Sequence, residues 1–249
     1  MRYFIELSYN GTNYHGWQNQ PNAISVQEVL EKALSTILGE TITVMGAGRT
    51  DAGVHAKQLF AHMDTDVAFN IDTLQYKLNS FLPKDVAIQS IFKVIPDAHA
   101  RFHATSRAYV YRIALRKSPF NFDQTYFLKQ SLDIDKLNQA TKILFDYTDF
   151  QCFSKSNTDV HTYNCDIMEA KWDVVEDEIH FTIKADRFLR NMVRAIVGTL
   201  INIGIGKLEV NDMHTIIQSK NRSEAGYSVP AKGLYLIKVE YPDTIKLND

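Results

Sequence analysis

The sequence contains few cysteines and no long apolar run. Its 249 residues include only Cys152 and Cys165, too few for a small secreted domain held together by disulfides. The longest uncharged stretch of the most apolar region, Ala195 to Gly206, is about half of the ~20 residues that a membrane helix needs. The first residues alternate like a strand and lack the basic and apolar regions of a signal peptide. We therefore expect a cytoplasmic protein with free thiols and no membrane segment.

Low counts of glycine and proline, 11 and 6, exclude a collagen-like or low-complexity chain. With 45% hydrophobic and 22% charged residues, the composition is that of an ordinary folded protein. The spacings typical of zinc sites, Cys-x₂-Cys or His-Glu-x-x-His, do not occur. We expect neither a metal nor another cofactor, although two looser groups contain ligating side chains: His15, Asp51, His55 and His62, and Cys152, His161 and Cys165.

The chain has no overall positive charge, since 27 basic residues face 29 acidic ones. Seven of its ten arginines nevertheless lie in two short segments. The first contains Arg101, Arg107, Arg112, Arg116 and Lys117, and the second contains Lys184, Arg187, Arg190 and Arg194 beside Asp186. Arginine suits phosphate contacts and stacking on bases, so this distribution favours a local site for a polyanion. The alternative is two ordinary solvated faces.

Hydrophobic periodicity predicts the same order of elements twice, strand, helix, strand, strand, helix, strand. In the first half these are Tyr3–Tyr9, a helix with Ser25 and Gly39 as caps, Ile42–Met45, Gln58–Asp64, a helix from Ile71 that stops before Pro83, and Val86–Val94. In the second half they are Tyr109–Leu115, Ile134–Phe145, a hairpin of Cys165–Val175 with Glu178–Ala185, an amphipathic helix over Phe188–Ile201, a short helix near Met213–Ile217, and Leu234–Tyr241.

This order predicts an α+β fold made of two ferredoxin-like, RRM-like halves, with a contiguous, mainly antiparallel sheet flanked by helices. We expect the halves to be residues 1–100 and 101–249. On the helix predicted after Ala185, Arg187, Arg190 and Arg194 recur at intervals of three and four and so share one side. If Arg194 is buried there, it needs an acidic partner.

The connection between two predicted strands, Gly46 to Ala56, is unusually rich in glycine and functional side chains. It contains Arg49, Asp51 and His55, but it matches neither a P-loop nor a dinucleotide-binding loop. One interpretation is a wide turn in which Asp51 caps the backbone. The other is a functional loop.

Four blocks of the sequence resemble the tRNA pseudouridine synthase A family, and they occur in the family's order between Tyr9 and Pro242. They are Tyr9-Asn10-Gly11 with Tyr14 and Gly16-Trp17-Gln18; Ala47-Gly48-Arg49-Thr50-Asp51-Ala52-Gly53-Val54-His55; Arg101-Phe102 with Arg107-Ala108-Tyr109-Val110-Tyr111; and Phe188-Leu189 with Asn191-Met192-Val193-Arg194 and Ile196-Val197-Gly198. Gly233-Leu234-Tyr235-Leu236 also fits.

The resemblance implies the pseudouridine synthase fold and a cofactor-free isomerase that converts uridine to pseudouridine at positions 38, 39 and 40 of the tRNA anticodon stem-loop. It implies that Asp51 is the catalytic aspartate, that Tyr109 stacks on the uracil, that Arg194 pairs with Asp51, and that Arg49 helps to displace the target base. It also implies a homodimer that grips one tRNA.

Peripheral RNA contacts are expected from the two basic segments and the neighbouring strand, namely Arg101, Arg107, Tyr111, Arg112, Arg187 and Arg190. The chain departs from the family pattern at two places. Arg187 stands where a small residue is common, and Asn164-Cys165 stands where a basic residue is frequent.

Two other functions fit parts of the sequence. A non-catalytic RNA-binding module would use Tyr109 and Tyr111 as stacking platforms and would have no use for Asp51. A glycoside hydrolase usually needs two carboxylates around the bond that it cleaves, and only Asp51 is recognised here. The sequence leaves open which tRNAs are modified and whether Asp51 adds to the sugar, adds to the ring or removes a sugar proton.

Overall fold

The computed structural model describes residues 1–156 and 160–247. The chain divides into two units, Met1–Thr105 with Tyr235–Asp249, and Ser106–Leu234. The last strand, which the sequence assigns to the C-terminal half, therefore belongs with the N-terminal unit. The reason is its pairing, because it runs parallel to a strand of that unit, with His55 opposite Tyr235 and Ala56 opposite Leu236.

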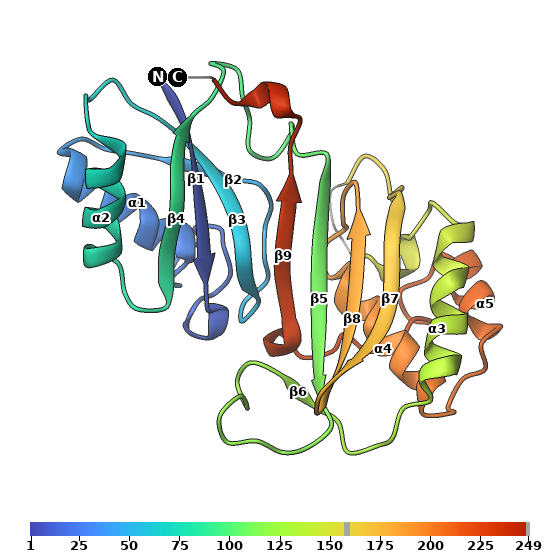
Figure 1. Ribbon diagram of the computed structural model, residues 1–249. Helices are drawn as coiled ribbons and strands as arrows, with labels where there is room; N and C mark the ends of the chain where they lie inside the picture. The colour runs from blue at the N-terminus through green and yellow to red at the C-terminus, as the bar shows by residue number, and fades with distance from the viewer. Residues whose placement is uncertain (157–159, 248–249) are drawn as a thin grey trace. The chain divides into compact units, whose positions relative to one another are not determined.

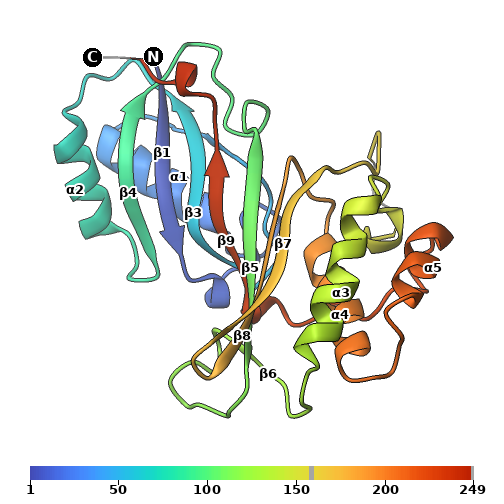
Figure 2. The same ribbon diagram turned by 45° about the vertical axis from the view of Figure 1, so that its right-hand side comes forward.

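The first unit is a sheet with two helices against one face (Figures 1 and 2). Its strands pair in the order β4-β1-β3-β9, and β2 pairs with β3; all of these pairs are antiparallel except β3 with β9. The elements are β1 (Arg2–Tyr9), α1 (Val26–Leu38), β2 (Val44–Gly46), β3 (His55–Asp64), α2 (Ile71–Phe81), β4 (Val86–Lys93) and β9 (Leu234–Glu240).

Local chemistry sets the ends of α1 where the sequence predicts them. The Ser25 hydroxyl accepts a hydrogen bond from the Glu28 N–H at 3.1 Å, which satisfies a backbone donor that the first turn leaves unpaired. At the other end Gly39 has φ +75° and its N–H donates to the Ser35 carbonyl, as in a left-handed cap. Leu30 and Leu34, which face the sheet, have no exposed surface.

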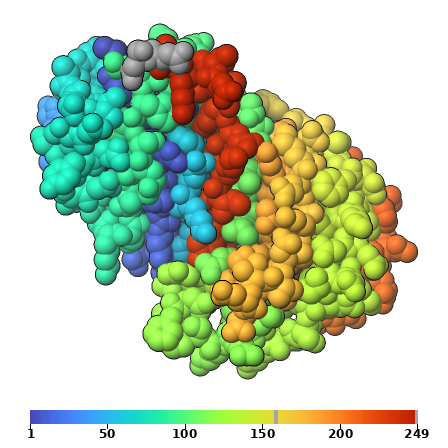
Figure 3. Space-filling view, in the orientation of Figure 1, coloured from blue at the N-terminus to red at the C-terminus, as the bar shows by residue number. Residues whose placement is uncertain are grey.

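The core of the first unit lies between the helices and one face of the sheet. Ile5 and Leu7 of β1 and Leu59 of β3 are completely buried, whereas the intervening Glu6 and Ser8 point to the other face and are half-buried. In Figure 3 the strands β4, β1, β3 and β9 reach the surface directly on that other face. The alternation in β1 therefore puts Ile5 and Leu7 against the helices, while Phe4 on the other face is buried among Phe60, Phe92 and Tyr241.

The second unit has an antiparallel sheet in the order β5-β8-β7, and the short strand β6 pairs parallel with β5. Trp172 of β7 joins the sheet to α3: its indole N–H donates to the Thr141 hydroxyl at 3.1 Å. The elements are β5 (Ser106–Ala114), β6 (Tyr126–Phe127), α3 (Ile134–Lys142), β7 (Ile167–Val175), β8 (Glu178–Ala185), α4 (Met192–Gly204) and α5 (Asp212–Ser219).

The α+β class and the mainly antiparallel pairing are confirmed, and several element boundaries differ from expectation; among them, β3 begins at His55, β5 at Ser106 and β7 at Ile167. The most consequential is α4, which begins at Met192 and not at Phe188, because Asn191 adopts the left-handed conformation with φ +68°. In addition, β2 begins at Val44, and the helix from Ile134 becomes a 3₁₀ turn at Ile143–Asp146. Within the described residues, every helix is too short or too polar to cross a membrane.

Candidate functional site

The loop that carries Asp51 joins β2 to β3 and is tied to the first sequence block by buried contacts. The hydroxyls of Tyr9 and Thr50 share a hydrogen bond of 2.8 Å, and the Thr50 carbonyl accepts from the Trp17 N–H at 3.3 Å. The turn itself closes through the Val54 N–H, which donates to the Asp51 carbonyl at 3.1 Å. The backbone on both sides of Asp51 is thus fixed by contacts with a segment distant in the chain.

Two glycines of the first block allow this close approach of backbones. A Cβ on Gly16, which has φ +89°, would lie 2.2 Å from the Thr50 carbonyl oxygen, and a Cβ on Gly11 would lie 2.0 Å from that of Val54. The Gly11 N–H donates to Nδ1 of His55 at 3.0 Å, and the His55 ring stacks on Tyr235 with the centroids 4.5 Å apart. The first two blocks therefore build one rigid structure.

Two candidate side chains of this loop reach solvent although the backbone is fixed. Asp51 is half-buried, and Arg49 is exposed. A carboxylate on a rigid turn that remains accessible can act on a bound substrate without first being rearranged. The half-buried Asp51 and the exposed Arg49 fit both interpretations of this loop, the wide turn and the functional loop.

Tyr109, in the second unit, lies on β5 opposite Ile183 of β8. Its ring is half-buried and packs edge-on against Phe188, with the centroids 5.2 Å apart and the planes at 90°. This T-shaped contact is a favoured aromatic geometry. It supports one side of the Tyr109 ring with a residue of the fourth sequence block.

Arg194 lies in the first turn of α4 and is half-buried. Its Nε donates to the Val229 carbonyl at 2.7 Å, and the Val229 N–H donates back to the Arg194 carbonyl at 3.2 Å. The next residue, Pro230, accepts a hydrogen bond from the Tyr111 hydroxyl at 2.9 Å. One short segment therefore holds both the arginine and the strand that carries Tyr109.

The expectation that Tyr111 contacts RNA is wrong, because its side chain has no exposed surface and no base can stack on it. Burial raises the pKa of Tyr111, and the nearby Arg194 charge acts in the opposite direction. A Cβ on Gly233 would lie 2.7 Å from the Tyr111 ring, which shows how tightly the ring is enclosed. Tyr111 supports the fold of the second unit.

Two arginines of the first basic segment are engaged within the second unit. Arg112 forms a two-pronged ion pair with Glu178, with both N–O distances 2.8 Å. Burial favours the protonated form of Glu178, but the hydrogen bonds from Arg112 and His180 outweigh it and hold the pKa of Glu178 below its usual value. Arg107 donates through Nη1 to the Asp186 carbonyl at 2.8 Å, so it braces the turn before Phe188.

The remaining candidate RNA contacts lie on surfaces. Arg101, in the first unit, is exposed with its guanidinium 5.6 Å from the centre of the Phe102 ring. Arg190 is exposed and Arg187 is half-buried. Both precede α4, so the expectation that they share one helix side with Arg194 is wrong. The left-handed Asn191 separates them from the helix.

The structure offers no grouping of ligating side chains for a metal within residues 1–156 and 160–247. Burial raises the pKa of Cys152 and of Cys165 to about 12 in each case, so both remain thiols at neutral pH.

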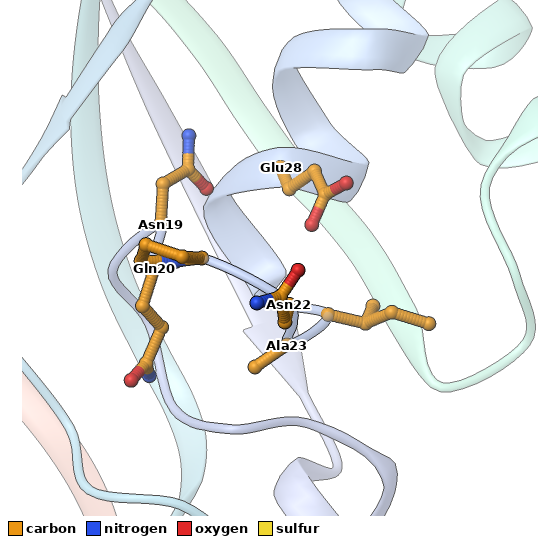
Figure 4. A pocket seen from close by; sticks show the side chains of 7 residues that line it. Asn19, Gln20, Asn22, Ala23 and Glu28 are labelled. Carbon is orange, nitrogen blue, oxygen red and sulfur yellow. The ribbon is translucent and has the colours of Figure 1, made fainter.

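An open hollow of about 680 Å³ lies beside the loop Asn19–Ile24 (Figure 4). Two of its amides are engaged by neighbouring parts of the chain: Gln20 donates to the His15 carbonyl, and Asn19 donates to Glu31 of α1.

Sequence reasoning missed the segment 222–230, which contacts Arg194. Arg222 lies outside both basic segments, and the sequence separation between this segment and Arg194 does not indicate that the two are in contact. The one residue of the segment that indicates a close approach to the helix is Gly226, since a Cβ there would lie 2.5 Å from the backbone nitrogen of Thr199. Glycine is common in polar loops, so its presence in this one does not identify such a contact.

Comparisons with known proteins agree with one another. A family model described as tRNA pseudouridine synthase matches residues 7–103 and 144–242. The chain is 53% identical over 247 residues to the tRNA pseudouridine synthase A of Bacteroides fragilis, covering 98% of each chain. It is 52% identical to the protein of that name from Bacteroides thetaiotaomicron, covering 98% of this chain and 92% of the other. With that from Parabacteroides distasonis the identity is 50%, over 98% and 97%.

Proposed function

The chain belongs to the tRNA pseudouridine synthase A family, and on that premise we propose that it is an isomerase that converts uridine to pseudouridine at positions 38, 39 and 40 of the tRNA anticodon stem-loop. The observation that carries this proposal is identity of about half of all residues along nearly the whole length of both chains. A protein that shared only an RNA-binding fold would not be expected to reach this identity over nearly the whole chain.

The proposed reaction breaks the bond between ring nitrogen 1 and carbon 1′ of the ribose, turns the uracil, and joins its carbon 5 to carbon 1′. The hydrogen on carbon 5 leaves as a proton, and nitrogen 1 gains one, so the base keeps its composition. No electrons are exchanged with another molecule. The work for the protein is to extrude the base, to stabilise the separated sugar and base, and to move protons.

Asp51 is the proposed catalytic carboxylate. Its rigid turn and partial exposure suit a group that must meet the extruded nucleotide in a fixed position. It must be ionised to act as a nucleophile or a base, and desolvation on RNA binding opposes ionisation. Arg194 is proposed as the pairing cation that counters this effect. A planar guanidinium can offer two parallel hydrogen bonds to a carboxylate.

Tyr109 is proposed to stack on the uracil, supported by the edge-on ring of Phe188. Stacking on an aromatic side chain is a common way to hold an unpaired RNA base. The exposed Arg49 is proposed to occupy the space that the base leaves in the stem. Arg101, Arg187 and Arg190 remain proposed phosphate contacts, whereas Arg107 and Arg112 already serve carbonyl and carboxylate partners within the second unit.

The experiment is the release of tritium from tRNA that carries the label on carbon 5 of its uridines. The isomerase must expel that hydrogen once for each base converted, and mapping of the product must place pseudouridine at positions 38 to 40. Binding of the tRNA without release would instead indicate the RNA-binding module. Release with pseudouridine elsewhere would keep the isomerase and refute the proposed positions.

We also propose a cytoplasmic homodimer that holds one tRNA. A single chain of 28.5 kDa offers little reach toward the body of a tRNA bound by its anticodon stem. A two-fold dimer presents each basic segment twice and lengthens the phosphate-binding surface. Light scattering at micromolar concentration tests the assembly. A mass about twice 28.5 kDa is expected, and a fully active species of 28.5 kDa would refute it.

A further inference from the structure

The loop 222–230 and the start of α4 are joined along their length by reciprocal hydrogen bonds. At Arg194 both the side chain and the backbone take part: Nε donates to the Val229 carbonyl, and the Arg194 carbonyl accepts from the Val229 N–H. One turn earlier, the Asn191 side chain donates to the Ser228 hydroxyl at 2.6 Å. The position of the Arg194 guanidinium is thus set by the loop as much as by the helix.

The other end of the loop is in backbone contact with α4. The Gly226 N–H donates to the Thr199 hydroxyl at 2.7 Å, and a Cβ on Gly198 would lie only 1.8 Å from the Tyr227 carbonyl oxygen. Two glycines facing each other let the loop run directly on the helix surface. A shift of the loop would therefore be transmitted to Val229, whose carbonyl orients Arg194.

Arg222 holds the loop in this shape. Its Nη1 donates to the Gly226 carbonyl at 3.0 Å, and its Nη2 donates to the Ser228 hydroxyl at 2.9 Å. Ser228 thereby links Arg222 to Asn191 at the start of α4. The side chain is half-buried, and its donors face the loop. The planar guanidinium offers these two donors in one fixed geometry, which a flexible ammonium group does not.

We propose that Arg222 is a positioning residue for turnover, which acts by holding the loop 222–230 so that the Val229 carbonyl orients the guanidinium of Arg194. Because a guanidinium is planar, a hydrogen bond at Nε determines where its outer edge points. This inference rests on the proposed function, in which Arg194 assists the catalytic carboxylate. Arg222 itself touches no substrate in this account.

The test compares Arg222→Gln in two backgrounds, the parent protein and Arg194→Lys, which keeps part of the activity. In the parent background, kcat for tritium release is expected to fall about 10–100-fold, the range for a small misplacement of a catalytic group, with tRNA affinity within a few-fold. In the Arg194→Lys background the same change is expected to lower kcat less than about twofold. Residues that act through one another show such non-additive losses. Arg222→Lys is expected to restore only part of kcat.

Lys220→Gln is the matched control, since it removes a nearby positive charge that pairs with Asp149 at 2.7 Å and leaves the loop bonds intact. It is expected to leave kcat unchanged. Equal kcat losses for Arg222→Gln in both backgrounds would overturn the inference and indicate general destabilisation. A loss of tRNA affinity with parental kcat would reassign Arg222 to a phosphate contact.

Ser228→Ala provides a second variant if Arg222→Gln does not fold. It removes only the hydroxyl that joins Arg222 to Asn191, and the same non-additivity with Arg194→Lys is expected. Additive losses would refute the positioning role. The proposed function fails separately: if the parent protein releases no tritium, or if Arg194→Ala keeps full kcat, the assumed role of that site is wrong, and the inference falls with it.

Discussion

Gly16→Ala tests whether the rigid contact between the first block and the Asp51 loop matters for turnover. The new Cβ would lie 2.2 Å from the Thr50 carbonyl oxygen, whereas real Cβ contacts essentially never fall below 3.0 Å. The two backbones must separate by at least the difference, about 0.8 Å. Because Thr50 precedes Asp51 directly, we expect most of this displacement to reach the proposed catalytic carboxylate.

Gly16→Ala is expected to lower both the stability of the protein and kcat. Alanine at φ +89° costs about 1–2 kcal/mol, and forcing a tightly packed contact apart costs about 1–3 kcal/mol more. For a chain of this size, 1 kcal/mol corresponds to a shift in Tm of about 2–4 °C. A misplacement near 1 Å lowers kcat roughly 100-fold. We expect both the Tm and kcat to fall.

Gly39→Ala distinguishes the cost of alanine at positive φ from the effect of displacing the Asp51 loop. Gly39 also has a positive φ, +75°, but a Cβ there meets nothing within 4 Å. This variant is expected to lose about 1–2 kcal/mol of stability and to keep parental kcat. The assay is tritium release at saturating tRNA together with thermal unfolding. If Gly16→Ala and Gly39→Ala lose stability to the same extent and both keep kcat, the reasoning about the Asp51 loop is refuted.

Arg194→Ala should lower kcat far more than tRNA affinity, with Arg194→Lys recovering part of it, and equal single-turnover rates for the parent and Arg194→Ala would contradict this. Glu178→Gln should lower stability at pH 7 by about 1 kcal/mol, and the difference should be smaller near pH 3. The pKa of Glu178 is depressed, so its contribution is complete above the unfolded value and is lost as pH falls through the folded one; a loss of the same size at both pH values would contradict it. Raising the salt concentration should weaken tRNA binding steeply, since several phosphates are neutralised at once, and a flat dependence would oppose the proposed arginine contacts.

Local signals in the sequence were sufficient for many elements. The cap residues Ser25 and Gly39 marked both ends of α1 because capping depends on neighbours in the chain. The sequence predicts that α4 begins at Phe188 because Phe188 and Leu189 continue the apolar spacing of the helix. Periodicity does not detect one left-handed residue such as Asn191. Because of the conformation of this one residue, Arg187 and Arg190 lie before the helix and not in it.

The candidate site was only partly accessible to sequence reasoning. Asp51 is predicted from a loop dense in glycine and polar residues and from the family resemblance of the surrounding blocks, and its role stays a prediction. The supports of the site were not found, since Tyr9 with Thr50 and Arg222 with Ser228 are contacts that only folding creates. Tyr111 shows the opposite error: we expect it to contact RNA, but the loop at Pro230 and Gly233 covers it.

The most direct test of the central claim is tritium release from carbon-5-labelled tRNA by the parent protein and by Asp51→Asn, measured under single-turnover conditions with tRNA binding measured in parallel. The variant keeps the size of the side chain and removes its charge. We predict release by the parent and none by Asp51→Asn, with affinities within a few-fold, because phosphate contacts supply most of the binding. Release by Asp51→Asn near the parental rate would contradict the account.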